Sequence, residues 1–200
     1  MPSNLHEDRL DLVAQWLDQP DITSVLDLGC GSGSLLQRLV HNPRLRRILG
    51  VEQSGMLIHQ AKHNLAGWLC AESPLQFRQG SFTDTTLPFT GFDAATLVET
   101  IEHVDPGQLA LVERAVFAHY RPGQVIITTP NGEYNPLLGL GPGEKRDPDH
   151  RFEWPRDRFR KWCLGIAGRQ GYQVRISGIG EADDQLGSPT QVARFTRLES

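Results

Sequence analysis

The sequence predicts an α/β fold: a doubly wound, mostly parallel sheet with helices on both faces and an antiparallel closing strand. Two observations predict it. Short apolar runs alternate with longer stretches of helical periodicity over most of the 200 residues. The first apolar run, residues 24–28, leads directly into a glycine-rich loop, which is typical of a strand–turn–helix unit. Such sheets bind ligands beyond the carboxyl ends of their strands, so that edge is where function is expected.

The first half of the chain supplies three strands and three helices. A helix is predicted over residues 5–17 because Leu10, Val13 and Leu17 recur at intervals of three and four. The run 24–28 has the apolar character of a buried strand, and the glycine loop after it predicts the start of a helix. The remaining predicted elements are a helix over 34–40, a strand over 48–51, a helix over 55–69 and a strand over 75–77.

The second half continues the alternation and then departs from it. Leu109, Val112 and Val116 have the spacing of a buried helix face, which predicts a helix over 106–120. A loop rich in Gly and Pro, residues 130–148, interrupts the pattern. The other predicted elements are strands over 92–98 and 125–129, a helix over 156–170, and closing strands over 172–177 and 191–196.

Composition predicts one globular domain over residues 1–200, because 38% of the chain is hydrophobic and 22% is charged. No apolar run approaches the roughly 18 residues of a membrane helix, and the polar first eight residues do not resemble a secretory signal. Three widely spaced cysteines favour reduced thiols and a cytoplasmic protein. The net charge of −4 argues against a general nucleic-acid coat. Residues 144–175, however, carry nine basic and five acidic side chains, either a solvated helix face or a surface for an anionic partner.

The glycine loop reads Asp27-Leu28-Gly29-Cys30-Gly31-Ser32-Gly33, and an acid, Glu52, ends the second predicted strand. Glycines let a backbone approach a ligand closely, and a carboxylate at that distance can accept hydrogen bonds from a nucleoside ribose. The acid before the first glycine suits a cationic amino-acid cofactor and would repel a pyrophosphate. The loop resembles the first motif of class I S-adenosylmethionine-dependent methyltransferases. That resemblance implies these cofactor-binding residues: Gly29, Gly31, Gly33, Glu52 and, near the adenine, Ser81.

Three potential metal ligands, Glu99, Glu102 and His103, lie within five residues at the end of the strand over 92–98. One helical turn would place the two carboxylates on one side, where they repel each other unless a cation lies between them. His150, in the long loop, is the candidate fourth ligand. Two carboxylates and two imidazoles favour a divalent cation such as magnesium or manganese.

Here the sequence resembles the small-RNA 3′-terminal 2′-O-methyltransferases, the Hua enhancer family, which includes bacterial relatives that act in RNA repair. The resemblance covers nearly the whole chain, and its most specific segments are residues 99–103, 129–135 and 146–154. It implies that Glu99, Glu102, His103 and His150 hold the metal. Pro155 and Arg158 depart from the usual family residues, but both lie at a predicted helix start, where Pro is tolerated.

The implied reaction is methylation of the 2′-hydroxyl of the 3′-terminal ribose of RNA, with S-adenosylmethionine and a divalent metal that chelates the terminal 2′,3′-diol. The implied catalytic residues are Glu102, His103 and His150, and either His could relay the proton. Cations in the long loop are expected to bind RNA phosphates at this edge: Lys145, Arg146 and Arg151. The alternative path is a second basic cluster: Arg44, Arg46 and Arg47.

Three other functions stay open at this point. A metal-free small-molecule methyltransferase would give Glu99 and His150 no role. A metal-dependent catechol methyltransferase would also chelate a vicinal diol. An inactive RNA-binding module would not require the four candidate ligands together. The partners expected are an RNA 3′ end and RNA-repair proteins, with no membrane, and the chain is expected to be monomeric.

Overall fold

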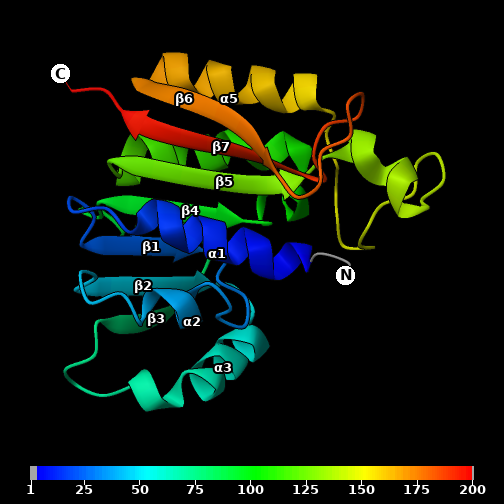
Figure 1. The fold of residues 1–200 in the computed structure, drawn as a ribbon. Coiled ribbons are helices and arrows are strands. Elements are labelled where there is room, and N and C mark those ends of the chain that lie inside the picture. Colours follow the sequence, from blue (N-terminus) through cyan, green and yellow to red (C-terminus); the bar gives the residue numbers. More distant parts are fainter. Residues whose placement is uncertain (1–3, 200) are drawn as a thin grey trace.

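The computed structural model describes residues 4–199 and centres on one seven-stranded sheet in the order β3-β2-β1-β4-β5-β7-β6 (Figure 1). Neighbouring strands pair in parallel except for β7, which runs antiparallel to both β5 and β6. The predicted mostly parallel sheet with an antiparallel closing strand is therefore confirmed. The strands are β1 Ser24–Leu28, β2 Arg47–Glu52, β3 Leu75–Gln79, β4 Ala94–Val98, β5 Gln124–Pro130, β6 Tyr172–Ile179 and β7 Thr190–Arg197.

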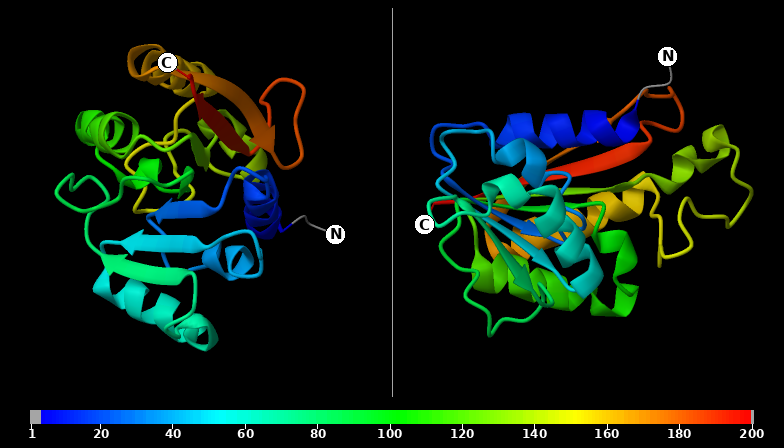
Figure 2. Two further views of the ribbon diagram at one scale, coloured as in Figure 1. Left: turned by 90° about the vertical axis from the view of Figure 1, so that its left-hand side faces the viewer. Right: turned by 90° about the horizontal axis from the view of Figure 1, so that it is seen from below.

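Helices cover both faces of this sheet (Figure 2). One apolar cluster joins Leu10, Val13 and Leu17 of α1 to the inner residues of β1 and β2. The other joins Val112 and Phe159, from the opposite helical layer, to β4, β5 and β7. The α-helices are α1 Leu5–Leu17, α2 Leu36–Leu39, α3 Gly55–Asn64, α4 Leu109–Glu113 and α5 Arg156–Gln170. The 3₁₀ helices are η1 Ala66–Trp68, η2 Ile101–His103, η3 Pro106–Gln108 and η5 Gly132–Leu138. The segment η4, Arg114–Tyr120, is a π-helix.

Three predicted helices differ from the structure. The helix expected over 55–69 ends as α3 at Asn64 and is followed by the 3₁₀ turn η1. The helix expected over 34–40 is reduced to the four residues of α2. The helix expected over 106–120 is divided into η3, α4 and the π-helix η4. Both Phe117 and Tyr120 of η4 are buried, and the Tyr120 hydroxyl donates hydrogen bonds to the backbone oxygens of Phe82 and Asp84. This segment therefore anchors the loop after β3.

The carboxyl ends of β1, β2, β4 and β5 lie at one edge of the sheet, together with the start of α1 (Figure 1). The chain after β5 extends beyond this edge and returns to it before α5 begins. Its backbone rejoins the edge where the Arg151 amide donates to the Glu102 carbonyl at 2.7 Å. Within residues 4–199, no helix combines the length and the apolar character needed to cross a membrane.

Candidate active site

The glycine loop lies beside a cavity of about 260 Å³ at the carboxyl edge of β1. Gly29 and Gly31 line it, with φ angles of 75° and 55°. A Cβ on Gly29 would lie 2.7 Å from Thr100 Cγ2, which is closer than two carbon atoms can approach. A side chain there would therefore clash with Thr100 and would also strain the left-handed backbone. Gly33 has another use, because a Cβ there would lie 2.9 Å from Leu65 Cδ1. It permits close helix packing and is not among the lining residues.

Glu52, the last residue of β2, contacts the backbone of the glycine loop. Its carboxylate accepts hydrogen bonds from the Gly31 amide at 3.1 Å and from the Ser54 amide at 2.8 Å. The side chain thus holds the glycine loop in shape while remaining only partly buried. Ser81, the residue expected near an adenine, instead has its hydroxyl 2.8 Å from that of Thr83.

Asp27 and Arg9 place opposite charges in the same cavity. Asp27 is buried and accepts a hydrogen bond from Thr96 Oγ1 at 2.8 Å, and burial raises its pKa to about 7. Arg9 reaches the cavity from α1, and its buried Nε makes no hydrogen bond but lies 3.5 Å from the Glu99 carboxylate, which also lines the cavity. Two opposite charges beside an open backbone fit a zwitterionic amino-acid ligand.

The three residues Glu102, His103 and His150 converge at the neighbouring strand end. Each residue has one potential metal-ligating atom, and these three atoms lie within 4.8 Å of one another. The centroids of the two imidazole rings are 4.9 Å apart. Glu102 Oε2 accepts a hydrogen bond from Thr129 Oγ1 at 2.9 Å, whereas Oε1 is buried with no partner. This donor set fits a divalent cation, because a cation would satisfy the orphaned oxygen and two neutral imidazole nitrogens.

Electrostatics agree with that fit. Burial, and then the nearby Glu99 carboxylate, raise the pKa of Glu102 well above its usual range. Burial and the neighbouring His150 lower the pKa of His103. Neutral imidazole is the form that binds a metal.

Glu99 lies outside this group. Its φ of 49° is left-handed, so the chain turns at Glu99 and the η2 turn begins only at Ile101. The single helical turn expected across Glu99 and Glu102 is therefore wrong. Glu99 Oε1 accepts a hydrogen bond from Thr128 Oγ1 at 3.0 Å and lies 3.5 Å from Arg9 Nε. The carboxylate lines the glycine-loop cavity instead, and its role as a metal ligand stays a prediction.

The basic residues divide into different environments. The Arg146 guanidinium turns inward, donating from Nε to Asn135 Oδ1 at 2.8 Å and from its terminal nitrogen to the Asn131 carbonyl at 2.7 Å. Lys145 donates to the His150 carbonyl at 2.8 Å. The Arg151 side chain is 61% exposed, with Nε 3.6 Å from Asp105 Oδ1. Arg151 and Lys145 are both exposed, whereas Arg146 is partly buried and hydrogen-bonded within its own loop, which disfavours its expected contact with phosphate.

The alternative basic cluster lies at the other edge of the sheet. Arg47 begins β2 and its guanidinium stacks 3.9 Å from the Phe92 ring centroid. Arg44 forms an ion pair with Asp18. Arg47 lies at the amino end of β2, whereas Glu102 follows the carboxyl end of β4, which disfavours this cluster as the path of RNA to the site.

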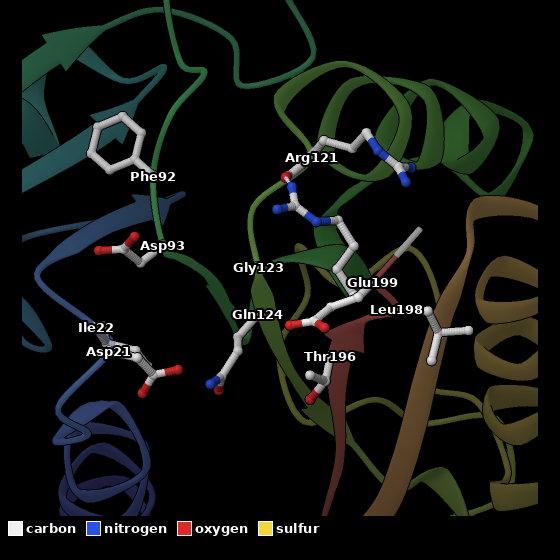
Figure 3. A pocket seen from close by; sticks show the side chains of 11 residues that line it. Asp21, Ile22, Phe92, Asp93, Arg121, Gly123, Gln124, Thr196, Leu198 and Glu199 are labelled. Carbon is white, nitrogen blue, oxygen red and sulfur yellow. Dashed lines mark hydrogen bonds between the residues drawn. The ribbon is translucent and has the colours of Figure 1, made fainter.

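A larger cavity, of about 570 Å³, also lies at that opposite edge (Figure 3). Asp93, just before β4, and Gln124, the first residue of β5, line it. The Asp93 carboxylate is occupied by the amides and hydroxyls of Thr23 and Ser24. None of the predicted site residues lines this cavity, so size alone does not identify the site.

Sequence patterns missed three residues of the site. Arg9 had a usable signal: it is four residues before Val13, so it lies on the apolar face of α1. Thr129 and Glu153 had none, because one is a strand residue among apolar neighbours and the other is an acid in a polar loop. Glu153 Oε1 lies 2.5 Å from His150 Nδ1.

Comparison with known proteins gives a consistent result. Residues 25–123 match the model of a methyltransferase domain. The small RNA 2′-O-methyltransferase of Mus musculus is 32% identical over 96% of this chain, which spans about half (51%) of that relative's length. The methyltransferase domain of bacterial CtHen1 is 39% identical, with a TM-score of 0.87 over 96% of this chain and 100% of that one. The small RNA methyltransferase HEN1 is 31% identical, with a TM-score of 0.88 over 98% of this chain and 25% of that one.

Proposed function

Because this chain belongs to the Hen1 family of small RNA methyltransferases, we propose that it methylates the 2′-hydroxyl of the 3′-terminal ribose of RNA. The observation that carries the proposal is the convergence of Glu102, His103 and His150 beside the glycine-loop cavity. Glu99, which lines the cavity, is three residues from Glu102 in the cluster. A methyl donor in the cavity and a hydroxyl acceptor at the cluster would therefore be neighbours.

The cavity residues suit S-adenosylmethionine. Asp27 offers a carboxyl group and Arg9 a positive charge to the two ends of its amino-acid group. Glu52 is not among the lining residues, but it accepts a hydrogen bond from the lining Gly31 amide and offers a carboxylate for the ribose hydroxyls. The fold is that of class I S-adenosylmethionine-dependent methyltransferases. When bound, this cofactor supplies a methyl group on a sulfonium, and the close approach of the backbone at Gly29 and Gly31 leaves room for it.

The cluster would hold a divalent cation through Glu102, His103 and His150, with Glu99 as the proposed fourth ligand. When bound, such an ion supplies positive charge that favours the ionised 2′-hydroxyl and can hold both hydroxyls of a terminal ribose. That His103 or His150 relays the hydroxyl proton stays a prediction, because an imidazole that binds the ion through one nitrogen carries its own proton on the other. The predicted association with RNA-repair proteins and the monomeric state stay predictions.

Methyl transfer from radiolabelled S-adenosylmethionine tests this proposal directly. Four oligonucleotides of one sequence would be compared: RNA with a free 3′ end, the same RNA ending in 2′-deoxyribose, the same RNA ending in 3′-phosphate, and DNA. The chain would first be stripped with a chelator and then supplied with Mg²⁺, Mn²⁺ or Co²⁺. We expect label only in the first RNA and only with added metal.

Two variants test whether the metal requirement depends on the cluster of Glu102, His103 and His150. Glu102→Ala and His103→Ala should each abolish transfer while cofactor binding, measured by calorimetry, is retained. Full activity after exhaustive chelation would overturn the metal requirement. Equal labelling of the free and 3′-phosphorylated RNA would overturn recognition of the terminal diol, and transfer only to small molecules would overturn the RNA substrate.

A further inference from the structure

We propose that Glu153 is a positioning residue that fixes the ring of His150 so that its Nε2 atom faces Glu102 and His103. The inference rests on the proposed metal-dependent function and deepens it. Glu153 Oε1 lies 2.5 Å from His150 Nδ1, and both side chains are nearly inaccessible, at 3% and 8% exposure. Because Nδ1 is engaged, Nε2 is the ring atom left to join the cluster.

The hydrogen bonds around Glu153 determine which atom carries the imidazole proton. The Arg146 amide donates to the same oxygen, Oε1, at 2.8 Å, and Asn135 Nδ2 donates to the other oxygen at 2.6 Å. A carboxylate surrounded by donors acts as an acceptor, so Nδ1–H of His150 is the donor. Nε2 then presents a lone pair, the arrangement that carboxylate–histidine pairs give to metal ligands.

A chain of hydrogen bonds connects Glu153, through Asn135 and Arg146, to Asn131 at the end of β5. Asn135 Oδ1 accepts from Arg146 Nε at 2.8 Å, and the Arg146 terminal nitrogen reaches the Asn131 carbonyl at 2.7 Å. Asn131 is two residues after Thr129, whose hydroxyl positions Glu102. The same strand end therefore sets both Glu102 and, through this network, His150. That connection explains why an arginine expected on the RNA surface is turned inward.

A matched control lies in the same loop. Glu144 is an exposed acid whose Oε2 accepts from the Gly141 amide in its own turn, and it has no hydrogen bond to an imidazole. Glu144→Ala removes a loop carboxylate of the same type without touching His150. Glu153→Gln keeps an amide oxygen that can accept from Nδ1, but it loses the hydrogen bond from Asn135.

Binding of Mn²⁺ to the full chain, followed by electron paramagnetic resonance without RNA, tests the inference. We expect Glu153→Ala to raise the Kd for Mn²⁺ by about 10–100-fold, the usual effect of losing such a partner. Glu153→Gln should fall between Glu153→Ala and the parent, and Glu144→Ala should match the parent. Cofactor affinity should be unchanged in all three, because Glu153 is not among the residues that line the glycine-loop cavity.

The histidine tautomer gives a readout that needs no metal. Long-range ¹H–¹⁵N spectra of the chelator-treated parent should show His150 protonated at Nδ1, and Glu153→Ala should shift it toward the other tautomer. If Glu153→Ala abolishes folding, Glu153→Gln carries both measurements. Parent-like Mn²⁺ affinity in Glu153→Ala, or equal weakening by Glu144→Ala, would overturn the inference alone. A parent chain that binds no Mn²⁺ would instead overturn the proposed metal-dependent function.

Discussion

Arg9 Nε lies 3.5 Å from Glu99 Oε1, and this ion pair joins the first helix to the end of β4. The Arg9 side chain is 9% exposed. Its charge also lowers the pKa of Glu102, which burial and Glu99 raise. One buried cation therefore faces two carboxylates at the point where the cofactor cavity meets the candidate metal cluster.

Removing that cation should destabilise the fold. Arg9→Leu would leave Glu99 beside Glu102 without its partner, and loss of one member of a buried pair costs about 3 kcal/mol of unfolding free energy. Urea denaturation in the presence of a chelator would measure this cost. The double variant Arg9→Leu with Glu99→Gln should recover most of it. If the double variant were as unstable as Arg9→Leu, the loss would come from packing and not from the unpaired charge.

Asp27 should make stability depend on pH. Burial raises its pKa in the folded chain to about 7, above the ordinary value of 3.8, so the folded state keeps a proton that the unfolded chain releases. The stabilisation from that proton is complete below the unfolded pKa and is lost as pH rises through about 7. Asp27→Asn should therefore raise Tm relative to the parent at pH 8 more than at pH 5.

Asparagine can still accept from Thr96, so this comparison isolates the charge. The exposed acid Glu72 supplies the control, since Glu72→Gln should leave the pH dependence of Tm unchanged. Parallel Tm curves for the parent and Asp27→Asn between pH 5 and 8 would show that Asp27 has an ordinary pKa.

Glu52→Ala tests the cofactor side of the site. Loss of a charge-assisted hydrogen bond should weaken S-adenosylmethionine binding by about 1.5–3 kcal/mol. Part of this loss has a structural origin, because Glu52 also accepts from the amides of Gly31 and Ser54. Calorimetry on Glu52→Gln, which keeps one acceptor, would separate the two contributions. Unchanged affinity in both variants would remove Glu52 from the cofactor site.

The sheet was predictable because its signals are local. Apolar runs and helical spacing identify the strands and helices, and the predicted bounds of α1, β1 and α5 agree with the structure. Parallel connections then bring the glycine loop and the β4 end to one edge, as the sequence predicts. The π-helix η4 had no such signal, since Leu109, Val112 and Val116 fit an ordinary α-helix equally well.

The site was less predictable because side-chain direction in loops depends on tertiary partners. Three of the four expected ligands converge. Spacing could not show that Glu99 would adopt a left-handed backbone and face Arg9, which comes from a helix ninety residues earlier. Nor could composition show that Arg146 would find acceptors inside its own loop. Charge patterns give the number of cations in a segment but not their orientation.

That difference in orientation gives the last prediction, which separates Arg146 from Arg151. A single-stranded RNA phosphate contact contributes about 0.7 to the slope of log K against log salt. Arg151→Ala removes an exposed guanidinium beside the cluster and should reduce the slope for RNA binding by about that amount, with a raised KM for RNA. Arg146→Ala should leave the slope unchanged and lower Tm instead, because it leaves Asn135 Oδ1 without its arginine donor and leaves the Asn131 carbonyl with the Tyr134 amide alone. Arg44→Ala, at the opposite edge, is the matched control and should change neither the salt slope nor Tm.

The measurements are fluorescence-anisotropy titrations of a short RNA at several salt concentrations and thermal unfolding of each variant. A reduced slope in Arg146→Ala with unchanged Tm would mean that Arg146 leaves its internal partners to bind phosphate, and would refute the orientation seen here.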